Sequence, residues 1–303
     1  MVTGVPPWDP EVLARIGALH LRARQASLGL QHGAHRSSRV SSNVEFADYK
    51  EYSPGDPLKD LDWRVAARSD RLVVRRHQAE TDLRAILVLD ASGDLGTGEE
   101  GRYRYPGLNG SKFAYAITMV ATLAYFLQRR GEPVGLMILG GRGVRWPYIP
   151  PRASVPHLAQ IFAALAALAP AGRASLDRGL RDLGSRVQRR SLVVLISDFM
   201  EEPAEWGPAL LALGQRRADV RALHLFDRRE WGLDYADPLR FYSPEGGDPL
   251  PVDPAGARDA FGEVVNEYLD EVRAALARPR ALHLLVGTHE PLDHVLHRVV
   301  GGR

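Results

Sequence analysis

The chain has 303 residues, of which 45% are hydrophobic and 25% are charged, and it contains 29 glycines, 21 prolines and no cysteine. This balance excludes a disordered or collagen-like chain, and the length allows one large α/β unit with an appendage, or two domains. The absence of cysteine excludes disulfides, cysteine-ligated zinc, iron–sulfur clusters and thiol catalysis, which leaves oxygen ligands as the route to a metal.

The formal net charge of +2 gives no reason to expect polyanion binding over the whole surface. Residues 12–44 nevertheless contain no acid and five arginines, namely Arg15, Arg22, Arg24, Arg36 and Arg39. No recognisable nucleic-acid-binding module accompanies this basic arm, so nucleic-acid binding is the least favoured interpretation. No apolar run reaches the ~18 residues of a membrane span, and the first residues lack the features of a signal peptide. We therefore expect a cytoplasmic protein without a membrane span.

Residues 1–79 are predicted to form an N-terminal appendage. Its first element is an amphipathic helix over 10–30, because apolar residues recur there at helical spacing. A segment rich in charged and aromatic residues follows at 45–68, and a short strand is predicted at 72–74. We expect Trp63 to pack this segment against the rest of the chain, since large aromatic side chains are usually covered.

Residues 80–303 alternate apolar strands with helices. Such alternation predicts an α/β domain, built as a doubly wound, mostly parallel sheet with helices on both faces. Strands are expected at 85–89, 134–139, 144–149, 191–197, 220–226 and 281–286, and helices at 111–129, 155–168, 175–188, 204–216, 255–277 and 291–300. The second and third strands are expected to form a hairpin, and residues 228–254 an irregular insertion.

Two of the buried strands are each followed by an aspartate at the end where such sheets bind ligands. Asp90 begins the loop Asp90-Ala91-Ser92-Gly93-Asp94, and Asp198 follows the strand at 191–197. These oxygen ligands suit Mg²⁺ or Mn²⁺ better than zinc. The structural alternative is that each aspartate only caps the loop or helix that follows it.

The pattern Asp90-x-Ser92, with Ser197-Asp198 ending a later strand, resembles a von Willebrand factor A domain with its metal-ion-dependent adhesion site. The upstream segment is more specific: residues 45–56, followed by Asp62-Trp63-Arg64 and Ala66-Ala67-Arg68, resemble the signature of the bacterial family called domain of unknown function 58. In that family the signature immediately precedes the A-like domain, and here the similarity extends over nearly the whole chain from about Gly33.

The resemblance implies a von Willebrand factor A-like fold and a metal site, with Mg²⁺ as the cofactor. The ligands it implies are Asp90, Ser92, Asp94, Ser175 and Asp198. The chain departs from the adhesion-site pattern because Asp94 replaces a serine, and because only Ser175 is available where a threonine is expected. Two alternatives stay open: the extra carboxylate strengthens Mg²⁺ binding through its charge, or it marks a degenerate site that leaves no coordination position for a partner's acidic residue. The resemblance also implies a non-enzymatic interaction or adaptor protein that works with a MoxR-type AAA+ ATPase.

The alternative function is a Mg²⁺-dependent hydrolase that uses the carboxylates of Asp90 and Asp198. It would need a nucleophile or general base nearby, and no histidine occurs in either site loop. Residues 107–112 have the wrong order for a phosphate-binding loop, and no serine has the context of a hydrolase nucleophile. We therefore expect no catalytic residues.

Overall fold

The computed structural model describes residues 44–51, 65, 73–79, 84–98, 101–104, 109–144, 147–244 and 246–300. The chain divides into two compact units, one of them Arg36–Asp82 and the other Met1–His35 together with Leu83–Arg303. The helix predicted at 10–30 and the packing role predicted for Trp63 lie outside the described residues.

The smaller unit contains a two-stranded antiparallel sheet. Strand β1 (Val44–Glu51) pairs with β2 (Val73–Ala79), and the register shifts between Phe46 and Asp48. The short strand predicted at 72–74 therefore exists but extends further along the chain, while β1 occupies part of the charged and aromatic segment.

The larger unit is built on a six-stranded sheet with the order β10-β7-β6-β3-β4-β5. All neighbouring strands run parallel except β5, which is antiparallel to β4. The strands are β3 (Ala85–Asp90), β4 (Val134–Leu139), β5 (Tyr148–Arg152), β6 (Leu192–Ser197), β7 (Asp219–Phe226) and β10 (Leu282–Gly287). The predicted α/β fold with a doubly wound, mostly parallel sheet is confirmed.

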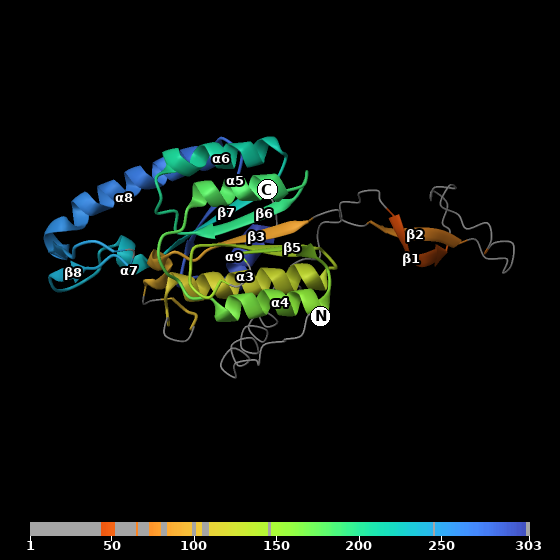
Figure 1. The fold of residues 1–303 in the computed structure, drawn as a ribbon, viewed down its shortest axis with the longest axis horizontal. Coiled ribbons are helices and arrows are strands. Elements are labelled where there is room, and N and C mark those ends of the chain that lie inside the picture. The colour runs from red at the N-terminus through yellow and green to blue at the C-terminus, as the bar shows by residue number, and fades with distance from the viewer. Residues whose placement is uncertain are drawn as a thin grey trace, which may run out of the picture. The chain divides into compact units, whose positions relative to one another are not determined.

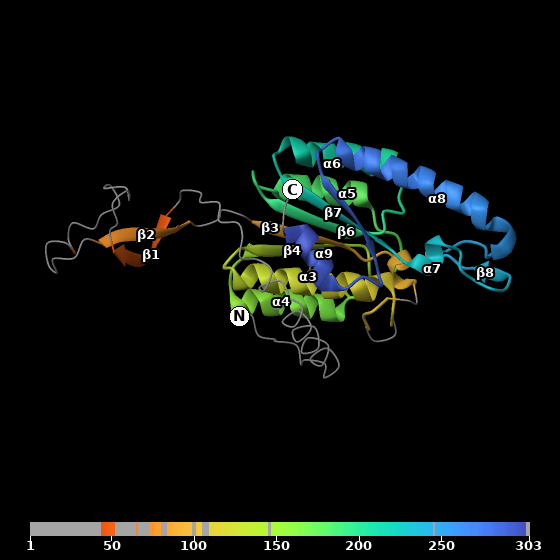
Figure 2. The same ribbon diagram turned by 180° about the vertical axis from the view of Figure 1, so that it is seen from behind.

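Helices cover both faces of this sheet, as the two opposite views show (Figure 1, Figure 2). One face packs against α3 (Lys112–Arg129), α4 (Val155–Ala167) and α9 (Leu292–Val300). The other face packs against α5 (Leu176–Arg186), α6 (Pro203–Gln215) and α8 (Pro254–Ala277). None of the described helices is both long and apolar enough to cross a membrane.

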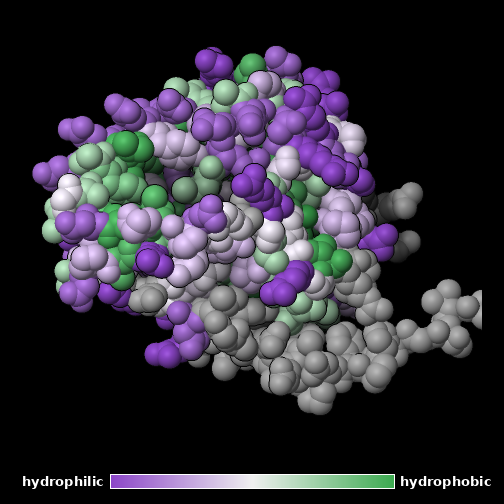
Figure 3. Space-filling view, turned by 60° about the vertical axis from the view of Figure 1, so that its left-hand side comes forward, coloured by the Kyte–Doolittle hydropathy of each residue, from purple (hydrophilic) through white to green (hydrophobic). Residues whose placement is uncertain are grey.

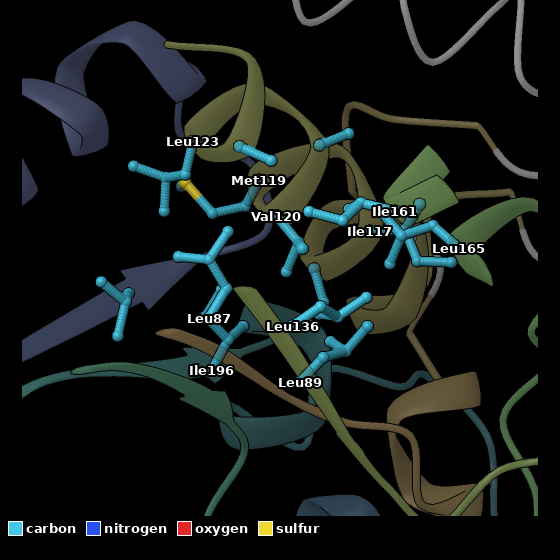
Figure 4. Packing of buried hydrophobic residues seen from close by; sticks show 14 of the residues in the cluster. Leu87, Leu89, Ile117, Met119, Val120, Leu123, Leu136, Ile161, Leu165 and Ile196 are labelled. Carbon is cyan, nitrogen blue, oxygen red and sulfur yellow. The ribbon is translucent and has the colours of Figure 1, made fainter. Parts of the chain in front are cut away.

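The central strands β3, β4 and β6 are buried along their whole length, which explains their unbroken apolar sequences. Side chains of a strand alternate between its faces, so Leu87 and Leu89 of β3 join the core under α3, which Figure 4 shows from close by. Ile86 and Val88 belong to the core on the opposite face. Packing on both faces holds β3 in place within the sheet and so fixes the position of Asp90 at its end.

Two sequence-based predictions were wrong in detail. The second strand of the hairpin lies at Tyr148–Arg152, not at 144–149, and it includes Pro150 and Pro151. A proline is tolerated there because β5 is the edge strand and needs hydrogen-bond donors on one side only. The insertion at 228–254 is not wholly irregular, since it contains α7 (Arg228–Trp231) and a hairpin of β8 (Leu239–Phe241) and β9 (Leu250–Val252).

Candidate functional site

The aspartates predicted from the sequence meet at the carboxyl edge of the sheet. Strands β3 and β6 are parallel neighbours, so Asp90 and Asp198 emerge side by side. They line a pocket of about 280 Å³. The pocket also contains Ser92, Arg173, Ala174, Met200 and four further acidic residues, namely Asp94, Glu201, Glu202 and Glu205.

Asp90 lines this pocket and is almost fully buried. Its Oδ1 accepts a hydrogen bond from the Ser92 backbone N–H (2.8 Å), and its Oδ2 accepts one from the Ser197 hydroxyl (2.6 Å). Burial, and next the negative charge of Asp198, raise the pKa of Asp90 to about 7. Asp90 therefore holds the loop after β3 to the end of β6, and at neutral pH it carries only part of a charge.

Asp198 is paired with a lysine from another layer of the fold. Lys112, the first residue of α3, donates from Nζ to Asp198 Oδ2 (2.9 Å) and lies 3.0 Å from Glu230 Oε2. Burial lowers the pKa of Lys112, but the charges of Asp198 and Glu230 outweigh it and raise the pKa above the ordinary lysine value. The ammonium group is therefore a permanent positive charge beside the pocket.

The loop between β3 and α3 carries the two remaining predicted ligands of this segment. Ser92 is buried, whereas Asp94 is partly exposed at the start of a short 3-10 helix (η2, Gly93–Gly96). Backbone hydrogen bonds from Gly93 N to Gly172 O (2.8 Å) and from Ala171 N to Ala91 O (3.1 Å) fix the loop. Partial burial and the charge of Asp198 raise the pKa of Asp94.

Ser175, the last predicted ligand, has a different local role. Its hydroxyl accepts a hydrogen bond from the Arg178 backbone N–H (3.3 Å) and so caps the N-terminus of α5. It is not among the residues that line the pocket, although its neighbour Ala174 is. The structure thus brings together Asp90, Ser92, Asp94 and Asp198, but not Ser175.

Three glutamates extend the acidic edge along the start of α6. Glu201 accepts a hydrogen bond at Oε1 from the Leu176 backbone N–H (2.7 Å), so it caps α5 from outside. Glu202 and Glu205 are exposed. In the described part of the chain, neither they nor Asp94 form a side-chain hydrogen bond or an ion pair.

The donor set does not form a ready metal site. Among the described residues, no group of three or more histidines, cysteines, aspartates or glutamates is arranged to hold a metal ion. The oxygens of Asp90 are already engaged by Ser92 and Ser197, and one oxygen of Asp198 is bound to Lys112. These contacts fit an edge stabilised by a lysine better than one organised around Mg²⁺.

Sequence reasoning missed Lys112, Glu230 and the three pocket glutamates, Glu201, Glu202 and Glu205. Lys112 is one of only three lysines among 39 basic residues, and it follows the N-cap Ser111 of the predicted helix. That position at the start of a helix, after the loop from β3, was the available signal. Glu230 lies in the insertion, where no pattern indicated a contact with α3.

Known proteins similar to this chain include uncharacterized proteins of Mycobacterium tuberculosis (Rv1480) and Mycobacterium bovis (Mb1516). Each is 28% identical over 269 residues, which cover 87% of this chain and 81% of the relative. A similar solved structure is the conserved hypothetical protein BatB from Bacteroides thetaiotaomicron, with 10% identity and a TM-score of 0.46 over 72% of this chain and 97% of that one. Another is the SpRpn10 VWA domain, with 12% identity and a TM-score of 0.41 over 71% and 95%.

One family model spans most of the sequence signature at 45–68 and most of the α/β unit that follows it. The model described as protein of unknown function DUF58 matches residues 48–268. The chain therefore belongs to the DUF58 family.

Proposed function

We propose that this chain is a non-enzymatic interaction or adaptor protein that binds its partner through the acidic pocket at the carboxyl edge of the sheet. The observation that carries the proposal is that the pocket's carboxylates fall into two groups. Asp90, Asp198 and Glu201 are tied into the fold by hydrogen bonds, whereas the side chains of Asp94, Glu202 and Glu205 form no hydrogen bond or ion pair in the described residues. The positive charges of Lys112 and Arg173 nevertheless act on Asp94. A rigid frame thus presents negative charges that belong to no ion pair of the described residues, which is the arrangement that selects a charged partner.

The partner we propose is a MoxR-type AAA+ ATPase. Membership of the DUF58 family and the resemblance to von Willebrand factor A domains support this choice. The edge would then act as a degenerate adhesion site, in which the Lys112 ammonium supplies the positive charge beside Asp198.

The test is direct binding between the purified full-length chain and the MoxR-type ATPase encoded in the same genome. Titration calorimetry would compare the wild type with Asp94→Asn and Glu202→Gln, each of which removes a charge without removing a contact of the fold. Asp182→Asn is the matched control, because Asp182 is an exposed acid that pairs with Arg186 on α5. We expect each pocket variant to raise the dissociation constant about tenfold, which corresponds to about 1.4 kcal/mol of binding free energy. The control should leave the dissociation constant unchanged.

Two results would overturn the proposal. One is the absence of binding to the ATPase in both Mg²⁺ and EDTA. The other is metal-dependent phosphatase or nuclease turnover that is lost in Asp90→Asn, because that result would assign the same carboxylates to hydrolysis.

A further inference from the structure

The N-terminal half of α8 extends beyond the core. No residue between Ala255 and Tyr268 is buried, whereas Leu269, Val272 and Leu276 pack into the sheet. Gly262, in the middle of this half, has open space where a Cβ would point. At ~1.5 Å per residue, roughly 20 Å of helix therefore carries no fully buried side chain. Figure 1 shows this half of α8 beside α7 and β8.

This half of the helix has an apolar face. Phe261, Val264, Val265 and Tyr268 recur at the spacing of one helix face, and Val264 is 60% exposed. The same stripe continues into the buried residues of the second half. Phe261, Val265 and Tyr268 are half-buried, and Tyr268 packs against the core, whereas Val264 is exposed. The described elements therefore cover this face only in part.

The apolar face meets the acidic pocket at Tyr268. The single hydroxyl proton of Tyr268 is shared between the backbone carbonyls of Phe199 and Glu201. Between these two residues lies Met200, which lines the pocket and is 60% exposed. We call Phe261, Val264, Val265, Tyr268 and Met200 the α8 face. Figure 3, in which this end of the unit is turned forward, shows hydrophobic side chains gathered among hydrophilic ones.

The charges beside the α8 face decide what can cover it. Asp94, Glu202 and Glu205 stand on the adjoining pocket without ion pairs in the described residues. They repel anionic lipid headgroups, and a second copy of the same surface would bring like charges together. An occupant with apolar side chains and lysines or arginines complements both parts of the surface.

We propose that the α8 face and the acidic pocket together bind a basic amphipathic segment of a partner protein. Apolar side chains of that segment cover Val264 and Met200, and its cationic side chains pair with Glu202, Glu205 and Asp94. The inference rests on the proposed interaction function and adds the chemistry of the recognised segment.

The test uses the full-length chain and a fluorescent synthetic peptide of leucine and lysine that forms a helix with one apolar and one basic face. Fluorescence anisotropy would give the dissociation constant, and a leucine–glutamate peptide and a serine–lysine peptide are the controls. We expect the leucine–lysine peptide to bind tightest. Val264→Asp should weaken its binding by about tenfold or more, as loss of a central apolar contact does.

Val155→Asp is the matched control variant, because Val155 is also an exposed helical valine (71%) but lies on α4. It should leave the dissociation constant unchanged. The double variant Glu202→Gln with Glu205→Gln should weaken binding and reduce its dependence on salt.

Equal effects of Val264→Asp and Val155→Asp, or equally tight binding of the leucine–glutamate peptide, would overturn the inference. A second contrary result is that the chain does not bind the peptide but self-associates, or binds anionic vesicles, in a way that Val264→Asp abolishes. That result would also overturn the inference. Because the peptide assay contains no ATPase, its failure leaves ATPase binding by the pocket intact. Failure of ATPase binding with normal peptide binding would instead overturn the proposed function with its ATPase partner and leave the recognition of a basic amphipathic segment intact.

Discussion

The Nζ atom of Lys112 lies 2.9 Å from Oδ2 of Asp198, although 86 residues separate the two in the sequence. The contact ties the first residue of α3 to the end of β6, and both side chains are nearly fully buried. A buried ion pair costs desolvation energy on both sides, so its main effect appears when one partner is removed and the other stays buried without its counter-charge.

Replacing Lys112 by glutamine should therefore destabilise the protein strongly. The loss should be about 3–5 kcal/mol in the free energy of unfolding, measured by urea titration, because Asp198 would remain buried and charged. Arg181→Gln, which breaks the exposed pair with Asp177, should cost far less stability, because solvent screens that pair. Similar losses in the two variants would show that the buried pair has no special role.

The same substitution should create a response to Mg²⁺. Without the ammonium group, the carboxylates of Asp198 and Glu230 lack their cation, and a divalent ion can replace it. We expect Mg²⁺ at about 10 mM, which is enough to occupy a weak site, to raise the Tm of Lys112→Gln but not that of the wild type. An equal rise in the wild type would mean that the pocket binds Mg²⁺ beside the lysine.

Asp90 should make stability fall as the pH rises. Its pKa of about 7 in the folded protein exceeds the ordinary value of 3.8, so between these values the folded state holds a proton that the unfolded state has lost. The stabilisation is complete below pH 3.8 and is lost as the pH rises through 7. It amounts to something on the order of 4 kcal/mol for a shift of about three units.

Asp90→Asn stays neutral at every pH, so it should lack this loss. Urea unfolding at pH 4, 6 and 8 should show the variant gaining on the wild type as the pH rises. Asp182→Asn, at an exposed site, is the control variant and should not gain stability relative to the wild type as the pH rises. A difference between wild type and Asp90→Asn that is the same at pH 4 and pH 8 would contradict the assignment.

The fold was predictable because its central strands are buried on both faces. Their apolar runs contain no alternation, and this pattern occurs almost only in parallel sheets covered by helices. The convergence of Asp90 and Asp198 follows from the same fact, since β3 and β6 turned out to be neighbours. The shift of the edge strand to Tyr148–Arg152 was not predictable from apolar spacing, because it contains two prolines that only an edge tolerates.

The contacts within the site were less accessible from the sequence. Lys112 pairs with residues far along the chain, and no local pattern encodes such a distance. The two halves of α8 carry one continuous apolar stripe, so the sequence could not tell the buried half from the half that is covered only in part. Ser175 was a reasonable ligand by order along the chain, but a serine before a helix serves equally well as its N-cap.

Unlike Asp90, His224 should make the free energy of unfolding decrease as the pH is lowered. It is fully buried on β7, and its ring lies 5.5 Å from that of His283 on β10. Burial lowers the pKa of His224 to about 3, and the positive charges that His283, Lys112 and Arg273 bring from β10, α3 and α8 act in the same direction. Between pH 6.5 and 3 the unfolded state therefore binds a proton that the folded state excludes, and stability is lost as the pH falls through this range.

His224→Leu removes this buried titrating group while keeping an apolar side chain in the core. Between pH 7 and pH 4 the variant should lose less of its free energy of unfolding than the wild type, by a few kcal/mol for a shift of this size. His294→Leu, at an exposed position on α9, should follow the wild type. Urea midpoints at pH 4, 5.5 and 7 measure the trend. If His224→Leu loses as much stability on acidification as His294→Leu does, His224 is not the group that makes the fold sensitive to acid.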